Sequence, residues 1–471
     1  MHYQTLKQID EASLNILETV GIRLHHPDIR QLVQENGIQV VGETAFFKPH
    51  QVIRWVACAP ARFTLHARNP VHDMALGGDV VHYGAGYGCP AILAADGILR
   101  PALFEDYLTF VKLVHQSPLF HLNGGVIVQP TDLPPQQSAL AMISAAICHS
   151  DKCLLGIPGD EDTVREIMML VGTVFGGLDT LRRTPRIITL VNTTSPLQID
   201  RIALGTIRAC AEHGQPVIIS PGPMAGATGP ITLSGNIALG HAEALAGIAI
   251  AQMITPGTPV IYGLQATISD MKTGKVSIGS PGFAVQAAWG ARLAKMYHLP
   301  CRGGGAGTDA AAISVQGGYE SMMAMMVSCR EKINLILHGA GILKGYGAMS
   351  YEKFFVDTEI IRMIEYLIAD LDTSADALAL DVIREVGPGG QYLTHMHTMK
   401  NCRRVPWLPE IGVEGLPREG TTHGAELPHI AGKKQKMLAE YRRPRLEESA
   451  ERALLDYLGK IGLDLPRLIP A

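Results

Sequence analysis

The alternation of apolar and amphipathic segments is the clearest pattern in the sequence. From about residue 79 onward, apolar runs, mostly of four to seven residues, alternate with amphipathic stretches of 13 to 20 residues. Such runs predict buried strands, and the stretches between them predict helices. The predicted strands span residues 80–84, 119–128, 153–157, 186–191, 216–220, 259–263, 300–303 and 334–338. The predicted helices span roughly residues 103–116, 136–149, 161–175, 198–213, 232–254, 280–297, 317–329 and 353–371.

Eight successive strand–helix units predict an α/β fold with a parallel sheet. Each predicted strand is apolar throughout, so both of its faces are expected to be buried. This favours a closed (β/α)8 barrel, the TIM barrel, over the alternative of an open doubly wound sheet. The barrel is assigned to residues 79–372, with the active site at the carboxyl ends of its strands.

The two ends of the chain lack this alternation of predicted strands and helices. Residues 1–78 predict an N-terminal segment of helix, short strands and turns that packs on the barrel. Residues 373–471 predict a C-terminal helical extension with a short helix, a glycine-rich turn at 387–390 and a charged terminal helix. We expect this extension to lie on the barrel or on another subunit, and we expect a homo-oligomer.

Composition and charge narrow the class of protein. The chain is 47% apolar and only 18% charged, with a net charge of −4, so it has no electrostatic footprint for nucleic acid. The N-terminal stretch is amphipathic and polar, unlike a signal peptide. The apolar stretch 237–254 contains His241, Glu243 and Gln252, which predicts a buried helix rather than a membrane span. Eight scattered cysteines without a CxxC motif predict reduced thiols and a cytoplasmic location.

The residues that follow each predicted strand are the candidates for the site. These positions are rich in tyrosine and amides, whereas only Arg302 and Lys272 are basic, which disfavours a phosphorylated substrate. Aromatic faces attract quaternary ammonium groups, although tyrosine also lines pockets of other kinds. His338, at the end of the last strand, either takes part in catalysis or donates a structural hydrogen bond. The candidates near the strand ends are Tyr83, Tyr87, Asn192, Tyr262, Gln265, Gln316, Tyr319, Glu320 and His338. The sequence contains neither HExxH nor GxSxG, and no metal site is assigned.

Several of these segments resemble one known family. The resembling segments are PMAGATGPITLSGNIALGHAEALAGIAIAQMITPGTPVIYG (223–263), SDMKTG (269–274), GTDAAAISVQGGYES (307–321), SYEKFFVDTEI (350–360) and GPGGQYLTHMHT (387–398). The sequence is similar to the trimethylamine methyltransferase (MttB-like) superfamily, in its non-pyrrolysine branch of glycine betaine methyltransferase-like proteins. It departs from the family pattern at Gly282, Ala311 and Ser314, where Glu, Lys and Asp are usual.

The resemblance implies a (β/α)8 fold and a corrinoid-dependent methyltransferase. The implied substrate is a quaternary amine such as glycine betaine, proline betaine, carnitine or γ-butyrobetaine. The methyl group would pass to the Co(I) corrinoid of a cognate partner protein, and no cofactor would be tightly bound by this chain.

The resemblance and the strand-end positions together suggest roles for the candidates. Tyr83, Tyr87, Tyr262 and Tyr319, with Glu320, would surround the cation. Asn192, Gln265, Gln316 or His338 would bind the carboxylate, and His338 and Glu320 are the catalytic candidates. The alternatives are a zinc-dependent methyltransferase for another methyl donor and a non-catalytic betaine-binding protein.

Overall fold

The computed structural model describes residues 2–94, 96–412 and 427–463. Its centre is a sheet of seven parallel strands, each paired to its neighbour in parallel register. The strands in spatial order are β15 (Val260–Tyr262), β13 (Val217–Ser220), β11 (Ile187–Asn192), β10 (Cys153–Leu155), β9 (Phe120–Gly124), β6 (His82–Gly84) and β18 (Leu335–Ile336).

The two edges of this sheet approach one another through the segment around residue 301. Tyr262 of β15 forms a parallel bridge with Cys301, and Arg302 forms a parallel bridge with Leu335 of β18. The strand predicted at 300–303 is therefore present as two isolated bridges rather than as a regular strand. The long strand predicted at 119–128 is also shorter than expected, because β9 ends at Gly124, which has a φ of 91°.

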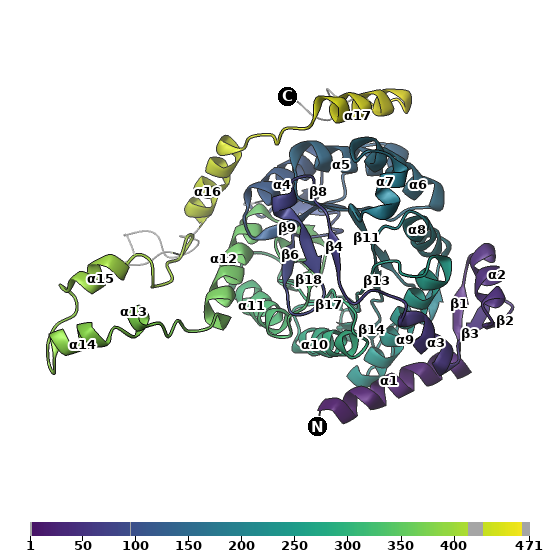
Figure 1. Cartoon of the computed structure of the whole chain (residues 1–471), viewed down its shortest axis with the longest axis horizontal. Coiled ribbons are helices and arrows are strands. Elements are labelled where there is room, and N and C mark those ends of the chain that lie inside the picture. The colour runs from purple at the N-terminus through teal and green to yellow at the C-terminus, as the bar shows by residue number, and fades with distance from the viewer. Residues whose placement is uncertain (1, 95, 413–426, 464–471) are drawn as a thin grey trace.

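Helices surround the sheet on its outer side (Figure 1). They follow the predicted order, except that the short helix α7 was not predicted. They are α4 (Phe104–Gln116), α5 (Pro135–His149), α6 (Glu161–Val174), α7 (Leu178–Arg183), α8 (Arg201–Glu212), α9 (Leu233–Ile254), α10 (Pro281–Met296), α11 (Val315–Arg330) and α12 (Tyr351–Ile368). The arrangement confirms the predicted α/β class with a curled parallel sheet.

Helix α9 is long and apolar enough to cross a membrane, but 94% of its apolar window is buried inside the structure. The N-terminal helix α1 (His2–Thr19) and helix α3 (Pro49–Val56) pack against it. Ser13 of α1 donates a hydrogen bond of 2.9 Å to the carbonyl oxygen of Ala238. Between these helices, β1 (Ile22–Leu24), α2 (Pro27–Glu35), β2 (Gln39–Val41) and β3 (Thr44–Phe46) form a small layer that is joined to β12 (Gln198–Ile199).

The interior of the curled sheet is apolar and is closed at its amino end by a hairpin. Side chains on alternate positions of a strand face the same side. The inward positions form one buried cluster with the hairpin of β4 (Phe63–Leu65) and β5 (Met74–Leu76), which flank the short helix η1 (Pro70–His72). The cluster consists of Leu65, Ala67, Met74, Leu76, Leu122, Cys153, Leu155, Ile188, Leu190, Ile218, Ile261, Leu335 and Leu337.

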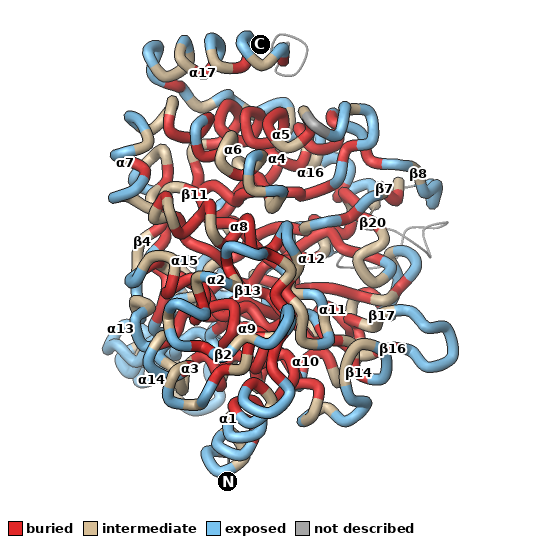
Figure 2. Tube along the Cα trace, turned by 90° about the vertical axis from the view of Figure 1, so that its right-hand side faces the viewer, coloured by how far each residue is buried: buried red, intermediate tan, exposed pale blue. Residues whose placement is uncertain are grey.

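Short strands lie at the carboxyl end of the sheet, opposite the β4–β5 hairpin. They are β7 (Ala91–Leu93), β8 (Leu99–Pro101), β14 (Met224–Ala225), β16 (Thr267–Ser269), β17 (Val276–Ser277), β19 (Ile342–Leu343) and β20 (Ala348–Met349). They belong to loops that follow the parallel strands and rise around their carboxyl ends. We call this end of the molecule the mouth. Figure 2 shows β16 and β17 on the opposite side from β4.

The C-terminal part leaves the body after α12 and later returns to it. It contains α13 (Ala375–Leu378), α14 (Leu380–Val386), α15 (Met396–Asn401), α16 (Leu427–Glu440) and α17 (Glu448–Lys460). Helix α16 packs on α4 and α12, and α17 packs on α6. Helices α13 to α15 extend away from the body, at the left of Figure 1.

Candidate functional site

A cavity of about 470 Å³ opens at the carboxyl ends of the parallel strands. Its lining comes from segments that directly follow or end these strands, as expected for the site of a parallel α/β fold. The cavity is lined by Tyr87, Gly88, Leu190, Asn192, Thr193, Ser220, Gly222, Met224, Gln265, Thr267, Val276, Arg302, His338 and Tyr346.

Arg302 is the buried cation of this cavity, with only 3% of its surface exposed. Its guanidinium donates one hydrogen bond of 3.0 Å to Ser220 Oγ and another of 3.0 Å to His338 Nδ1. Its Nε is buried and has no hydrogen-bond partner among the described residues. Within the described part of the chain, no carboxylate pairs with Arg302. Burial lowers its pKa to about 10, so the group keeps its charge at neutral pH.

A buried cation without a carboxylate partner is energetically costly unless another anion is available to it. Arg302 lines the cavity, so a ligand that carries a carboxylate can approach its guanidinium from the open volume. The structure therefore places a buried cation without a carboxylate partner among the described residues beside an open volume.

His338 lies next to Arg302 and is held in an unusual backbone conformation. Its φ is 64°, a left-handed value that non-glycine residues seldom adopt and that often marks functional sites. Burial first, and the charge of Arg302 second, hold the pKa of His338 well below its usual value. Because Arg302 donates to Nδ1, the ring proton of the neutral imidazole is on Nε2.

Aromatic rings form one wall of the cavity. The ring of His338 lies 4.9 Å from that of Tyr346 and 6.3 Å from that of Tyr87, measured between centroids. Gln265 Nε2 donates hydrogen bonds of 3.1 Å to the Tyr346 hydroxyl and 3.2 Å to the carbonyl oxygen of Gly304, which fixes the phenol. These rings and the neutral imidazole offer several π faces to a bound cation.

Three of the four tyrosines proposed as a cage do not reach this cavity. Tyr83 points outward, where its hydroxyl lies 3.6 Å from Cys329 Sγ of α11. Tyr262 also points outward and hydrogen-bonds His241 Nδ1 of α9 at 3.0 Å. Tyr319 is 61% exposed on α11. Since Ile261 faces the interior, its neighbour Tyr262 must face the helices. The expected four-tyrosine cage is therefore not formed, and Tyr87 is the member that lines the cavity.

Glu320 and Gln316 brace a loop instead of lining the cavity. The Glu320 carboxylate accepts hydrogen bonds from the Thr308 hydroxyl, from the Asp309 backbone N–H at 2.9 Å and from Gln316 Nε2 at 2.8 Å. Asp309 in turn accepts from the backbone N–H of Ile278 at 2.9 Å. Glu320 was expected to be catalytic, but it does not line the cavity, and its hydrogen bonds hold the 307–309 loop.

Asn192, Gln265, Tyr87 and His338 are brought together as expected, because all four line the cavity. Sequence reasoning did not select Ser220 or Tyr346, and it noted Arg302 only as an exception to the scarcity of basic residues. Arg302 carried a signal, since a cation directly after an apolar run is unusual in a chain with so few charges. Tyr346 lies between two glycines with a φ of 70°, a placement that strand-end counting does not reveal.

The three departures from the family pattern lie outside the cavity lining. Ala311 is exposed, and Ser314 is the N-cap of α11, where its hydroxyl accepts from the Gly317 backbone N–H at 3.2 Å. At Gly282, an added Cβ would lie 2.0 Å from Ile268 Cδ1, so a larger residue would displace that side chain. These substitutions therefore alter the surface and the packing of α10 and β16, not the residues that line the site.

A second buried carboxylate supports the loop after β11. Glu243 of α9 accepts hydrogen bonds from the Thr193 hydroxyl, from Ser195 Oγ at 2.8 Å and from the Leu197 backbone N–H at 2.8 Å. Burial raises the pKa of this carboxyl despite the three donors. Because Thr193 lines the cavity, Glu243 positions part of its wall from outside the sheet.

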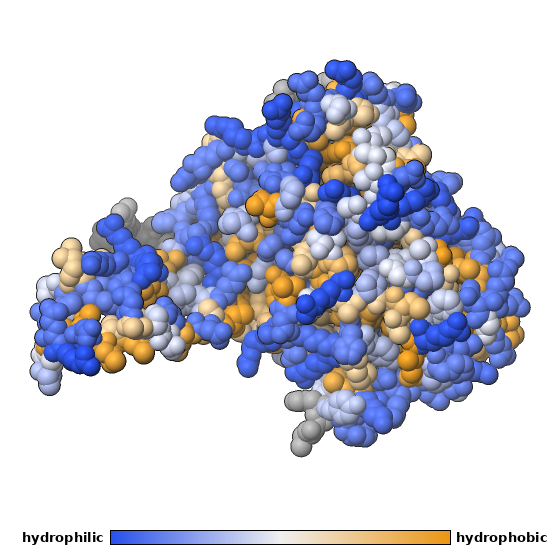
Figure 3. Space-filling view, in the orientation of Figure 1, coloured by the Kyte–Doolittle hydropathy of each residue, from blue (hydrophilic) through white to orange (hydrophobic). Residues whose placement is uncertain are grey.

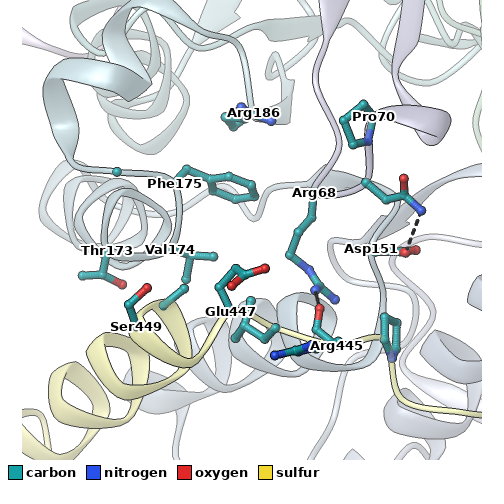
Figure 4. A pocket seen from close by; sticks show the side chains of 15 residues that line it. Arg68, Pro70, Asp151, Thr173, Val174, Phe175, Arg186, Arg445, Glu447 and Ser449 are labelled. Atoms are coloured by element: carbon teal, nitrogen blue, oxygen red, sulfur yellow. Dashed lines mark hydrogen bonds between the residues drawn. The ribbon is translucent and has the colours of Figure 1, made fainter.

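Another cavity, of about 740 Å³, lies at the opposite end of the molecule. It is bordered by Asp151 and Arg186, which precede β10 and β11, and by the segment 444–450. Figure 4 shows Arg68 reaching toward Arg445, whose carbonyl oxygen accepts its hydrogen bond, while Phe175 lies beneath Arg186. This cavity therefore marks where the C-terminal segment docks at the amino ends of the strands.

No group of three His, Cys, Asp or Glu side chains with the geometry of a metal site occurs in the described part of the chain. The structure thus offers no observation that favours the zinc-dependent alternative.

Comparison with known proteins identifies the family. The family model described as trimethylamine methyltransferase (MTTB) matches residues 1–463. The chain belongs to the trimethylamine methyltransferase family. It is 38% identical over 461 residues to a glycine betaine methyltransferase of Desulfitobacterium hafniense (strain Y51), covering 98% of this chain and 96% of that protein. It is 29% identical to a proline betaine:corrinoid methyltransferase of Eubacterium limosum, with 96% and 95% of the two chains covered.

The fold is also similar to that of a solved structure. The monomethylamine methyltransferase of Methanosarcina barkeri superposes with a TM-score of 0.53 at 10% identity, covering 92% of this chain and 86% of that chain. The family resemblance seen in the sequence is confirmed by these comparisons.

The neutral state of His338 can be tested directly. Since its pKa is held well below its usual value, its ring should not bind a proton between about pH 6 and pH 8. Nitrogen NMR of histidine-labelled protein, with the signal assigned by loss in His338→Gln, should show a constant ring shift over this range. A titration midpoint near pH 6.5 would contradict the geometry described above.

Proposed function

We propose that this enzyme removes a methyl group from a betaine and transfers it to the Co(I) corrinoid of a partner protein. The observation that carries the proposal is Arg302, a buried guanidinium without a carboxylate partner among the described residues, beside three ring-bearing side chains. A betaine fits both features, since its carboxylate can pair with the guanidinium and its quaternary ammonium can lie against the rings. The names of the two betaine-specific relatives support this substrate class and a corrinoid acceptor.

The substrate carboxylate is proposed to bind beside the hydrogen-bonded pair of Arg302 and Ser220. Ser220 Oγ accepts from Arg302, so its own hydroxyl proton is free to donate to the carboxylate. Asn192 lines the same cavity and adds an amide group, whereas Gln265 already donates its Nε2 hydrogen bonds to Tyr346 and Gly304. Which betaine is used depends on the length that fits between the carboxylate position and the rings.

The quaternary ammonium is proposed to lie against Tyr87, Tyr346 and the ring of His338. Each aromatic face attracts the cation by about 0.5–2 kcal/mol, with the larger values in desolvated sites. His338 contributes as a neutral ring and therefore does not repel the ammonium, because burial and, to a smaller extent, the charge of Arg302 keep it unprotonated.

This arrangement suits methyl transfer without an acid. When the N–CH3 bond breaks, its electron pair stays on nitrogen, and the product leaves as a neutral tertiary amine. The Co(I) centre of the partner supplies the electron pair of the new cobalt–carbon bond. The protein has no proton to deliver, and its tasks are to orient the methyl group toward the mouth and to exclude water. His338 and Arg302 therefore act by binding and orientation.

The corrinoid protein is proposed to dock over the mouth, because the cavity opens there.

We also propose that the sheet closes as an eight-stranded (β/α)8 barrel, with residues 300–303 as the eighth member. The two bridges of this segment support the proposal. Residues 1–78 and 373–471 are then extensions of the barrel at 79–372. A cytoplasmic location agrees with the eight free cysteines.

The decisive experiment mixes the enzyme with its cognate corrinoid protein reduced to Co(I) and follows formation of methyl-Co(III) by absorbance. We expect conversion with at least one betaine among glycine betaine, proline betaine, carnitine and γ-butyrobetaine, and none with trimethylamine. Calorimetric betaine binding without conversion would support the non-catalytic alternative. Conversion that is lost on chelation and restored by zinc would support the zinc-dependent alternative.

Replacing Arg302 tests the carboxylate position. Arg302→Met removes a charged hydrogen-bond donor worth about 1.5–3 kcal/mol, so betaine affinity should fall by about 10- to 150-fold. Binding of choline, which has no carboxylate, should not fall. Arg292→Met, which breaks the surface pair of Arg292 with Glu331, serves as the control and should bind betaine normally. Equal losses for betaine and choline in Arg302→Met would refute the assignment.

A pair of tyrosine variants tests the cation position. Tyr346→Ala removes a ring from the cavity wall and should weaken betaine binding by about 2- to 30-fold. Tyr319→Ala removes an exposed ring of α11 and should leave the affinity unchanged. Calorimetry measures the betaine affinity of both variants. A lower affinity in Tyr319→Ala with an unchanged affinity in Tyr346→Ala would instead support the cage first expected from the sequence.

A further inference from the structure

Residues 365–410 form a segment that we call the arm. It starts in the last turn of α12, contains α13, α14 and α15, and ends at Glu410, which pairs with Lys433 of α16. Figure 1 shows the arm extending from the body at α12, while α16 and α17 lie against the ring of helices. The arm is therefore an outward excursion between two anchored parts of the chain, not a free tail.

The base of the arm is firmly held. The Tyr366 hydroxyl donates a hydrogen bond of 3.0 Å to the carbonyl oxygen of Val405, which joins the outgoing and returning limbs. Glu359 of α12 accepts from the Glu410 backbone N–H at 2.8 Å, and the Glu410 carboxylate pairs with Arg362 and Lys433. These contacts fix the direction in which the arm leaves the body.

Beyond this base the arm lacks a core. All of its 46 residues are described, and none of them is buried. Its helices have four, seven and six residues, too few to be stable in water without tertiary contacts. The ordering cost of such a segment, about 1–2 kcal/mol per residue, must be offset by burial against something outside the chain.

The surface of the arm is unusually apolar. Figure 3 shows apolar side chains on the arm, at the left of the view. Thirteen of its large apolar side chains are at least 44% exposed. They are Tyr366, Leu367, Ile368, Leu371, Leu378, Leu380, Ile383, Tyr392, Leu393, Met396, Met399, Val405 and Leu408. Exposed apolar surface on this scale indicates a protein interface.

We propose that the arm binds the arm of a second copy of this chain. Its charge is divided in a self-complementary way. Residues 370–385 carry five acidic residues and one arginine, whereas residues 400–404 carry three basic residues and no acidic one. In a two-fold symmetric pair, the acidic limb of each arm meets the basic limb of the other, so that the same contact occurs twice.

The position of the arm favours a second copy over the corrinoid protein. Figure 2 places α13 and α14 on the side of β4, away from the β16–β17 hairpin at the mouth. A methyl acceptor must reach the mouth, and it must also dissociate after each turnover. A permanently apolar surface instead suits a permanent partner, since obligate interfaces are the more hydrophobic ones.

The size of the arm is sufficient for such an interface. A stable interface of standard size buries about 800 Å² and involves about 20–30 residues from each partner. The arm provides 46 residues, among them thirteen well-exposed large apolar side chains. The homo-oligomer expected from the sequence thus acquires a specific contact surface.

Sedimentation of the full-length protein tests the proposal. The wild type should sediment at twice the chain mass of 50.7 kDa at micromolar concentration, or at an even multiple of it. The triple variant Ile383→Glu, Leu393→Glu, Met399→Glu should lose this pairing and keep its betaine affinity. The matched control Val20→Glu, Val41→Glu, Val71→Glu changes three exposed apolar residues of the body and should remain paired. A monomeric wild type, or a paired arm variant, would overturn the proposal.

A charge exchange tests the pairing of the limbs. Asp376→Lys with Asp381→Lys, and separately Arg403→Glu with Arg404→Glu, should each weaken self-association by about tenfold or more at low salt. The chain that carries all four changes should regain it, because both contacts become attractive again. Failure of the fourfold variant to recover would exclude the proposed arm-to-arm pairing, whatever the result of the methyl transfer assay.

Discussion

The alternation of side chains along parallel strands is the constraint on which this structure depends. Both faces of the central sheet are buried, so each strand places one set of apolar residues in the interior and the other set beneath the helices. Leu190, Ile218, Ile261 and Leu335 fill the interior, and the β4–β5 hairpin closes its amino end. Polar groups that take part in binding are thereby confined to the carboxyl ends, where the strands release the chain into loops.

At these ends the position of one charge determines much of the chemistry. Arg302 is buried against Ser220 and His338, neither of which is an anion at neutral pH. Burial, together with the charge of Arg302, keeps His338 neutral. The positive charge of Arg302 is not balanced by a carboxylate among the described residues of the cavity. The loops around it are fixed from outside by buried carboxylates, with Glu243 holding the chain near Thr193 and Glu320 holding residues 308–309. Glu243 thereby supports part of the cavity wall without lining it, because Thr193 is a lining residue.

The sequence predicted the order of strands and helices well, because their apolar runs are long and regularly spaced. Four of the residues selected from the sequence, Tyr87, Asn192, Gln265 and His338, line the same cavity. It failed for Tyr83 and Tyr262, since a shift of one residue along a strand moves a side chain from the interior to the helical layer. Tyr346 was missed for another reason, as it enters the cavity from a loop between β19 and β20 whose path depends on left-handed residues.

The composition of the cavity bears on discrimination between a betaine and a simple methylamine. Such an amine has no carboxylate, and its ammonium would lie near Arg302 with no anion between them. Two like charges about 5 Å apart repel by about 3 kcal/mol at the effective dielectric constant of a protein site, which corresponds to more than a hundredfold in affinity. In the proposed binding mode, a betaine places its own carboxylate between the two cations, and the guanidinium makes an attractive contact. Under that assignment Arg302 would select for the zwitterion and against the simple amine with a single charge.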